Sequence, residues 1–205
     1  MAHRVLVRAR VPAVLAVVVP ALALLAGCSG GGGSGAAATT PPTPVPSSPT
    51  VTYEKGTTPP GTQLAVGRRA VVRFHPKGAP SSLLALTVTK IAKGRMPELR
   101  AFTLDQATRR SNVYYVTVRV QNKGHRNLVG LKPKLYGQVS KHLVVPPVVF
   151  GSTFRRCPDT GLPKRFTFGK SAALCLVMLA PHHGRVSAVQ WRFADGSQPI
   201  SWVRG

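Results

Sequence analysis

Side chains that could catalyse a reaction are sparse in the second part of this 205-residue chain. Acid–base catalysis of the glycosidase kind needs two positioned carboxylates. Only four acidic residues follow Gln63: Glu98, Asp105, Asp159 and Asp195. The last two stand in sequences typical of turns, and we expect structural roles for all four. After Gln63 no serine lies in the Gly-x-Ser-x-Gly elbow of hydrolases, so we expect a protein that is not an enzyme.

The histidines do not point to a metal site. One adjacent pair occurs, His182-His183, and its setting between Pro181 and Gly184 is typical of a solvated turn between two strands. A zinc site would need two further ligands, and no other histidine has a spacing that relates it to this pair. We therefore expect no metal and no cofactor.

The first 27 residues have the composition of a signal peptide. Arg4, Arg8 and Arg10 make a positive start, and an apolar run interrupted by two prolines follows over residues 11–25. A transmembrane helix needs about 20 apolar residues, whereas this run is shorter and ends in small residues. We therefore predict that residues 1–27 are cleaved off.

The end of this segment, Leu25-Ala26-Gly27-Cys28, resembles the lipobox of bacterial lipoproteins at all four positions. The resemblance implies that diacylglycerol is attached to the Cys28 sulfur, that the chain is cleaved before Cys28, and that the lipid anchors the protein to the outer face of the cell membrane. Two acyl chains anchor firmly, since each buried CH₂ contributes about 0.8 kcal/mol. The alternative is a plain secretory signal with an incidental cysteine.

Residues 28–62 are rich in Gly, Ser, Thr and Pro, a composition that cannot build a core. We predict a disordered linker here. Its glycine-rich beginning would be a flexible leash, and its proline- and threonine-rich remainder an extended spacer between the membrane and a folded domain.

The three cysteines are an odd number, and lipidation of Cys28 would leave Cys157 and Cys175 as a pair. Disulfides persist outside the cytoplasm, so we predict a bridge between a loop at Cys157 and a strand at Cys175. Closing a loop of this length would stabilise the fold by about 3 kcal/mol. The alternative is a free buried thiol at Cys175.

Residues 63–205 show the alternating pattern of β-strands. In the clearest strand, Tyr114–Val120, the even-numbered residues are apolar and should face a core, while the odd-numbered ones face away. Further strands are expected at residues 69–74, 83–91, 131–139, 142–150, 165–168, 172–179, 187–193 and 200–203. Residues 96–108 suggest at most a short helix. About seven to nine such strands indicate an all-β fold, an immunoglobulin-like β-sandwich, with a closed barrel as the alternative.

The end of the chain carries three further signals. Trp191 and Phe193 alternate with polar residues and should both face the core. Asp195-Gly196 is a strong signal for a tight turn. We expect this turn to fold Ile200 and Trp202 back as a terminal edge strand.

The domain also resembles a family of lipoprotein domains of unknown function from bacteria, in particular actinobacteria, that form an immunoglobulin-like, or telokin-like, sandwich. The matching features are Ala65-Val66-Gly67, the strand from Tyr114 to Val120 with Gln121-Asn122-Lys123-Gly124, the Cys157 and Cys175 pair, and Ile200-Ser201-Trp202. The resemblance implies the fold and a location at the cell surface. It supplies no catalytic residues.

The charge of the chain restricts its partners. Lys and Arg total 28 against 5 acidic residues, and removal of the signal segment with its three arginines leaves 28 − 3 = 25 basic side chains. This excess favours anionic partners, namely nucleic acid, lipid headgroups, or wall polymers bearing phosphate or carboxylate. An exported protein rarely meets its cell's nucleic acid, so we expect no nucleic-acid partner. The alternative is a solvated basic surface without a partner.

Two basic pairs, Arg155-Arg156 and Lys164-Arg165, flank the loop that carries Cys157. A disulfide would hold them together, which predicts an anion-binding patch; four unrelated solvated side chains are the alternative. We therefore expect a membrane-anchored, extracytoplasmic and non-catalytic module of the cell envelope. It would bind an envelope protein through its loops or an edge strand, or an anionic wall polymer or lipid headgroups through its basic surface. A role as an accessory to a wall hydrolase is disfavoured.

Overall fold

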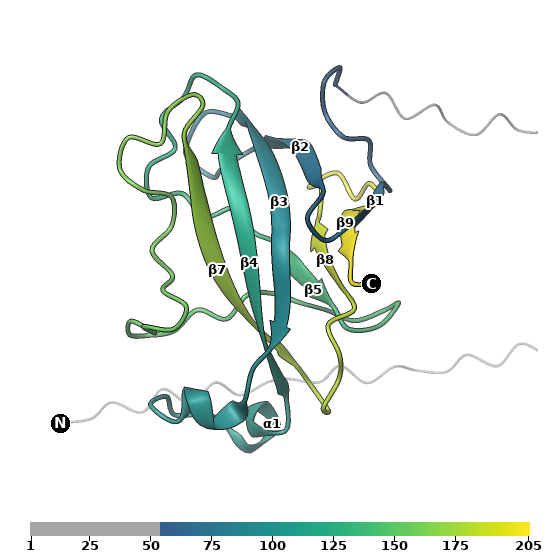
Figure 1. Cartoon of the computed structure of the whole chain (residues 1–205), viewed down its shortest axis with the longest axis vertical. Coiled ribbons are helices and arrows are strands. Elements are labelled where there is room, and N and C mark those ends of the chain that lie inside the picture. The colour runs from purple at the N-terminus through teal and green to yellow at the C-terminus, as the bar shows by residue number, and fades with distance from the viewer. Residues whose placement is uncertain (1–53) are drawn as a thin grey trace, which may run out of the picture. The chain divides into compact units, whose positions relative to one another are not determined.

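The computed structural model describes residues 54–205, which form a sandwich of two β-sheets (Figure 1). The predicted signal peptide, the lipobox with Cys28 and the linker up to residue 53 lie outside the described residues. The elements, in chain order, are β1 (Gln63–Ala65), β2 (Arg69–Phe74), β3 (Ser82–Lys93), the 3₁₀ helix η1 (Met96–Leu99), α1 (Gln106–Arg109), β4 (Asn112–Asn122), β5 (Tyr136–Gln138), β6 (Val144–Val145), β7 (Ser171–Ala180), β8 (Ala188–Trp191) and β9 (Ile200–Val203). No helix within residues 54–205 is long and apolar enough to cross a membrane.

The two sheets have the strand orders β2-β3-β4-β7 and β1-β9-β8-β5-β6. The first is antiparallel throughout, and its long strands β3, β4 and β7 lie to the left of β8 and β9 in Figure 1. Within residues 54–205 no ladder of backbone hydrogen bonds joins the sheets. The fold is therefore the predicted all-β, immunoglobulin-like sandwich and not a closed barrel.

The main core lies between the sheets and follows the predicted alternation of β4. Tyr114, Val116, Val118 and Val120 point inward and are at most 2% exposed. The opposite sheet contributes Trp202, which is fully buried and donates its indole N–H to the backbone carbonyl of Arg68 at 2.8 Å. Trp191 and Phe193 also face this core, as predicted.

Three predicted strands are wrong or too long. Residues 165–168 form no strand, because Arg165 has φ of 56°, a left-handed conformation that an extended strand cannot contain. The predicted strand 131–139 shrinks to β5, since Pro133 has no N–H to donate to a ladder. The predicted strand 142–150 shrinks to the two residues of β6, and two prolines follow it directly.

The last strand, β9, is not the edge of its sheet. It pairs with β8 on one side and, in parallel, with β1 on the other, where Leu64 lies opposite Trp202. Sequence reasoning did not find β1, because three residues are too few to show an alternating pattern. β1 is therefore the edge strand, and the expectation for Ile200–Val203 is corrected.

The segment just before β1 covers the free edge of β2. The backbone N–H of Thr58 donates to Val71 at 2.7 Å, and the Thr58 hydroxyl accepts from the Val71 N–H at 2.9 Å. Nearby, the N–H of Gly61 donates to the carbonyl of Gln198 at 2.9 Å. Residues 54–62, assigned to the linker by composition, thus lie against the sandwich and shield an edge that would otherwise be open to pairing.

Asn122, the last residue of β4, ties three loops together from a fully buried position. Its Oδ1 accepts from the Ser82 hydroxyl at 3.2 Å and from the backbone N–H of Gly124 at 3.0 Å. Its Nδ2 donates to the carbonyls of Arg126 at 2.6 Å and Phe166 at 2.7 Å. The sequence predicts a turn here but not this network of four bonds.

We expect Asn122→Ala to lower the free energy of unfolding by about 2–3 kcal/mol, because buried carbonyls and a hydroxyl lose their partners. Urea denaturation measures the loss. The matched control is Asn127→Ala, an exposed asparagine in the same turn, which should change stability by no more than about 0.5 kcal/mol. Equal effects of the two substitutions would contradict a structural role for the network.

Candidate functional site

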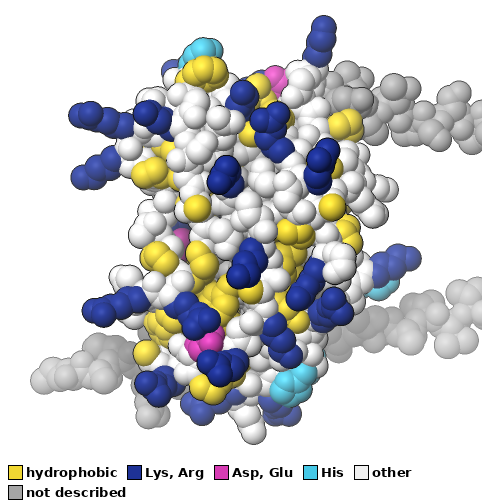
Figure 2. All heavy atoms as spheres, viewed as in Figure 1, with side chains coloured by type: hydrophobic (Ala, Val, Ile, Leu, Met, Phe, Trp, Pro, Cys, Tyr) yellow, Lys and Arg dark blue, Asp and Glu magenta, His cyan; other side chains and the backbone are white. Residues whose placement is uncertain are grey.

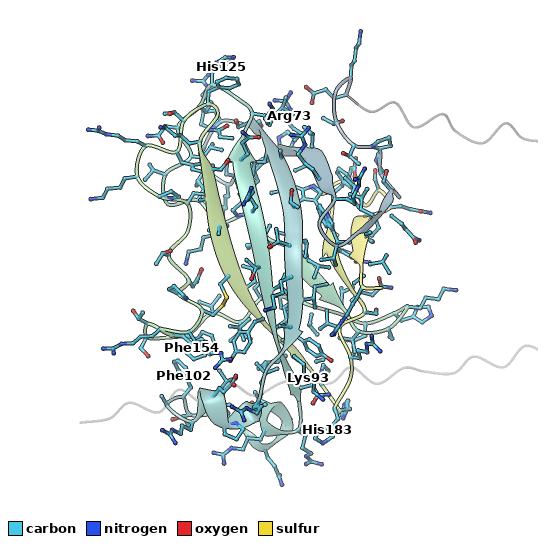
Figure 3. All side chains as sticks on the ribbon, viewed as in Figure 1. Arg73, Lys93, Phe102, His125, Phe154 and His183 are labelled. Carbon is cyan, nitrogen blue, oxygen red and sulfur yellow. A yellow bond between two sulfur atoms is a disulfide. The ribbon has the colours of Figure 1, made fainter. Side chains whose placement is uncertain are left out.

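A second hydrophobic cluster lies on the outer face of β4 and β7, where η1 and the segment 148–157 form a cover that we call the cap. The buried members of the cluster are Leu99, Val113, Tyr115, Cys157 and Val177. They are covered by η1 and by the segment 148–157, and Figure 3 shows Phe102 and Phe154 together at this end of the sheet, with Arg73 at the other. Sequence reasoning gave the outward direction of Tyr115 correctly but missed that this face is buried as well.

The predicted disulfide is formed at the cap. Cys157 lies in the loop and Cys175 on the outer face of β7, with their Cα atoms 5.2 Å apart. Three aromatic rings pack above it, those of Phe102 and Phe150 with centroids 4.3 Å apart and that of Phe154 within 6 Å of both. The bridge and the rings together hold the loop against the sheet.

A charged cluster sits at the rim of the cap. The Tyr115 hydroxyl donates to Glu98 at 2.8 Å, and the Arg156 guanidinium lies 3.3 Å from the same carboxylate. Arg156 also stands over the Tyr115 ring, 5.1 Å from its centroid. Arg95 completes the cluster through its backbone N–H and its Nε, both bonded to Glu98.

Burial raises the pKa of Tyr115 to about 12, and its hydrogen bond to Glu98 adds to the effect. The same hydrogen bond is the main reason that the pKa of Glu98 is lowered. The pair is thus fixed as a neutral phenol donating to a carboxylate over the ordinary pH range. This arrangement ties η1, which carries Glu98, to Tyr115 on β4.

The other carboxylates proposed from the sequence also have structural partners. Asp105 accepts from the N–H of Thr108 at 2.7 Å at the start of α1, and Asp195 accepts from the N–H of Ser197 at 2.9 Å in the predicted turn. Asp159 pairs with Lys132 at 2.6 Å. Within residues 54–205 no three His, Cys, Asp or Glu side chains are grouped so that they could hold a metal ion.

The histidine pair forms the predicted turn between β7 and β8. His182 and His183 have φ of 52° and 56°, and the N–H of His183 donates to the carbonyl of Arg110 at 2.9 Å. The carbonyls of His183 and Gly184 both accept from the Asn112 side chain. These contacts fix the backbone of the turn.

The four basic residues proposed as an anion patch have different surroundings. Arg155 and Arg156 line a shallow cavity of about 770 Å³ beside the cap, which Glu98 also lines. Lys164 and Arg165 do not line this cavity. They are exposed and precede Phe166, which is buried in the main core.

A larger concentration of basic groups occurs at the other end of the sandwich, in a groove of about 780 Å³. We call it the basic groove. β2 and β8 end there and β5 begins there, and its lining includes Arg73, Lys77, Lys132, Lys134 and Arg192 together with aromatic residues. Sequence reasoning missed it because these residues come from three distant segments, although the alternation of Lys with apolar residues over 131–136 was visible.

No family model matches the sequence, and no curated protein matches it. Among solved structures, the chain is similar to the secreted protein MPT63 from Mycobacterium tuberculosis, with 11% sequence identity and a TM-score of 0.43. The match covers 69% of this chain and 95% of that chain. A likeness this distant transfers no residue or activity.

We expect one of the four tyrosines to ionise near pH 12, as measured by ultraviolet absorbance of the phenolate. Because the pKa of Tyr115 in the folded protein lies above its ordinary value of 10.0, the stabilisation is complete below pH 10 and is lost as the pH rises from 10 to 12. Glu98→Gln should lower the midpoint, since an amide is a weaker acceptor than a carboxylate. Tyr115→Phe should remove the component of the titration near pH 12, and Tyr136→Phe should not. The reverse result would contradict the assignment of this component to Tyr115.

Proposed function

We propose that this protein is a lipid-anchored module on the outer face of the cell membrane that binds an anionic polymer of the envelope without catalysing a reaction. The excess of positive charge over residues 54–205 carries the proposal. All 5 acidic residues of the chain lie in this range, together with 25 basic ones. Figure 2 accordingly shows Lys and Arg side chains spread over the whole visible face, with few Asp and Glu among them.

The acidic residues neutralise little of this charge. In the described part of the chain, ion pairs involve only Arg73, Arg95, Arg156 and Lys132, which leaves 25 − 4 = 21 basic side chains without a carboxylate partner. Such a field attracts polyanions and raises their rate of association. The lipobox motif at Cys28 supports an extracytoplasmic location, where wall polymers and lipid headgroups are the abundant polyanions.

Two observations favour binding over catalysis. Four carboxylates, those of Glu98, Asp105, Asp159 and Asp195, are engaged by hydrogen bonds or ion pairs that hold turns, a helix start and the cap. The phenol of Tyr115 is held neutral to about pH 12. None of these groups is arranged as a general acid opposite a general base.

The anchor is tested with Cys28→Ser in a bacterial host that lipidates exported proteins. We expect the wild type in the membrane fraction and the variant in the soluble extracytoplasmic fraction, because only the thiol accepts the diacylglycerol. Ser34→Ala, a substitution nearby that keeps the thiol, should remain with the membrane. Membrane retention of the Cys28→Ser variant would contradict lipid anchoring.

Binding is tested with the unlipidated Cys28→Ser protein and wall polymer from the same host. We expect cosedimentation that weakens steeply between about 0.05 and 0.5 M salt, since a surface interaction is screened over a Debye length that shrinks from roughly 14 Å to 4 Å. Neutral dextran should not bind at any salt concentration. Absent or salt-independent binding of the anionic polymer would contradict the proposed function.

A further inference from the structure

The basic groove combines charge with aromatic surface. Phe74 and Trp191 meet edge to face at its base with ring centroids 6.2 Å apart, and both are 7% exposed. Tyr136 and Phe193, which are half-buried, also line it. An aromatic surface of this kind offers apolar contact area to a ligand and a ring face that attracts positively polarised C–H groups.

Three of the groove's five cations have no carboxylate partner among residues 54–205. Lys77, Lys134 and Arg192 are exposed and enter no ion pair there. The other two are held: Arg73 pairs with Glu54, and Lys132 with Asp159. The groove therefore has three basic side chains without a carboxylate partner, of which Arg192 also donates to the side-chain oxygen of Gln190 at 3.1 Å.

The acidic residue in the lining does not cancel this charge. Asp195 uses its Oδ1 to accept from the Ser197 N–H, and this bond lowers the pKa of Asp195. The carboxylate belongs to the tight turn between β8 and β9. It gives one negative charge against the three positive charges in the lining that have no carboxylate partner.

Trp191 lies at the base of the groove and can report on a ligand there. Its indole Nε1–H is buried without a hydrogen-bond partner, and in the described residues it is the one side-chain polar atom in this state. Buried donors are almost always satisfied, and leaving one unpaired costs about 1–3 kcal/mol. The other tryptophan, Trp202, has its acceptor within the fold. The unpaired donor therefore lies in the ring that also lines the basic groove.

We propose that the basic groove binds a sugar that carries a phosphate group. The inference rests on the proposed function and gives that function a site. The phosphate would accept from Lys77, Lys134 and Arg192, because Lys and Arg form their strongest hydrogen bonds with ionised oxygens. The C–H face of the sugar ring would pack on Tyr136 and Phe193, beside the ring of Trp191.

Neither half of such a ligand would fit alone as well as the whole. A bare phosphate would leave the aromatic surface uncovered, and a neutral sugar would leave three cations unpaired. A volume of about 780 Å³ is also in the range of small-molecule sites. Several adjoining units of a sugar-phosphate polymer could therefore pass through the groove, which connects the site to the proposed polymer.

The test is a titration of the unlipidated Cys28→Ser protein with glucose 1-phosphate, followed by the two tryptophan indole N–H signals in NMR spectra. We expect saturable displacement of the Trp191 signal and none of the Trp202 signal. Glucose and inorganic phosphate should each bind at least about tenfold more weakly, a difference of roughly 1.4 kcal/mol. The single substitutions Lys134→Glu and Arg192→Glu should each weaken glucose 1-phosphate binding at least about tenfold.

The matched control is Lys141→Glu, which makes the same change of charge at an exposed lysine between β5 and β6, beyond the end of β5 opposite the groove. It should leave the binding of glucose 1-phosphate unchanged within about twofold. If inorganic phosphate binds as tightly as glucose 1-phosphate, the sugar assignment is overturned. If Lys141→Glu weakens binding as much as Lys134→Glu, general charge explains the effect and the site is overturned.

The two proposals can fail separately. If the wall polymer binds the protein but glucose 1-phosphate leaves the Trp191 signal unmoved, the proposed sugar-phosphate site is overturned and the proposed function stands. A shifted Trp191 signal with no polymer binding at any salt concentration would overturn the proposed function and keep the site.

Discussion

The burial of β4 on both of its faces is the constraint on which the rest of this domain depends. Its inner face supplies the centre of the main core through Val116 and Val118, while Val113 and Tyr115 on its outer face lie beneath the cap. A strand in an antiparallel sandwich ordinarily has one wet face. Because part of this strand has none, a segment more than thirty residues further along the chain must return to cover it, and the disulfide to Cys175 keeps that segment in place.

The sequence predicted those parts of the fold whose signals are local. Alternation over Tyr114–Val120 predicted the strand and its inward face, and Asp195-Gly196 predicted the turn that Ser197 completes. Two of the failures are non-local. The edge strand β1 exists because β9 offers it a partner, and the false strand at 165–168 looks extended by composition, but Asn122 at the end of β4 binds the carbonyl of Phe166. No pattern within a short window carries either fact.

The candidate site shows the same division. The disulfide and the turn at His182-His183 could be predicted because each depends on residue types and on neighbours in sequence. The basic groove could not, because Lys77, Lys134 and Arg192 come from three segments that meet only when β2 and β8 end beside the start of β5. Charge counting finds an excess of cations, but only the sheet topology shows where cations and aromatic rings coincide.

The two ends of the sandwich use their charges differently, and the difference argues for where a ligand binds. At the cap, Glu98 draws in Arg95 and Arg156, whereas Arg100 and Arg155, which line the same cavity, have no carboxylate partner among residues 54–205. At the groove, Lys132 pairs with Asp159, which lies two residues after the bridged Cys157. The disulfide thereby helps to fix one wall of the groove from the far side, since Cys157 and Lys132 also line a common cavity of about 250 Å³. A cross-linked loop beside a groove with unpaired cations suits a binding module, because the rigid part reduces the entropy lost when the groove takes up a ligand.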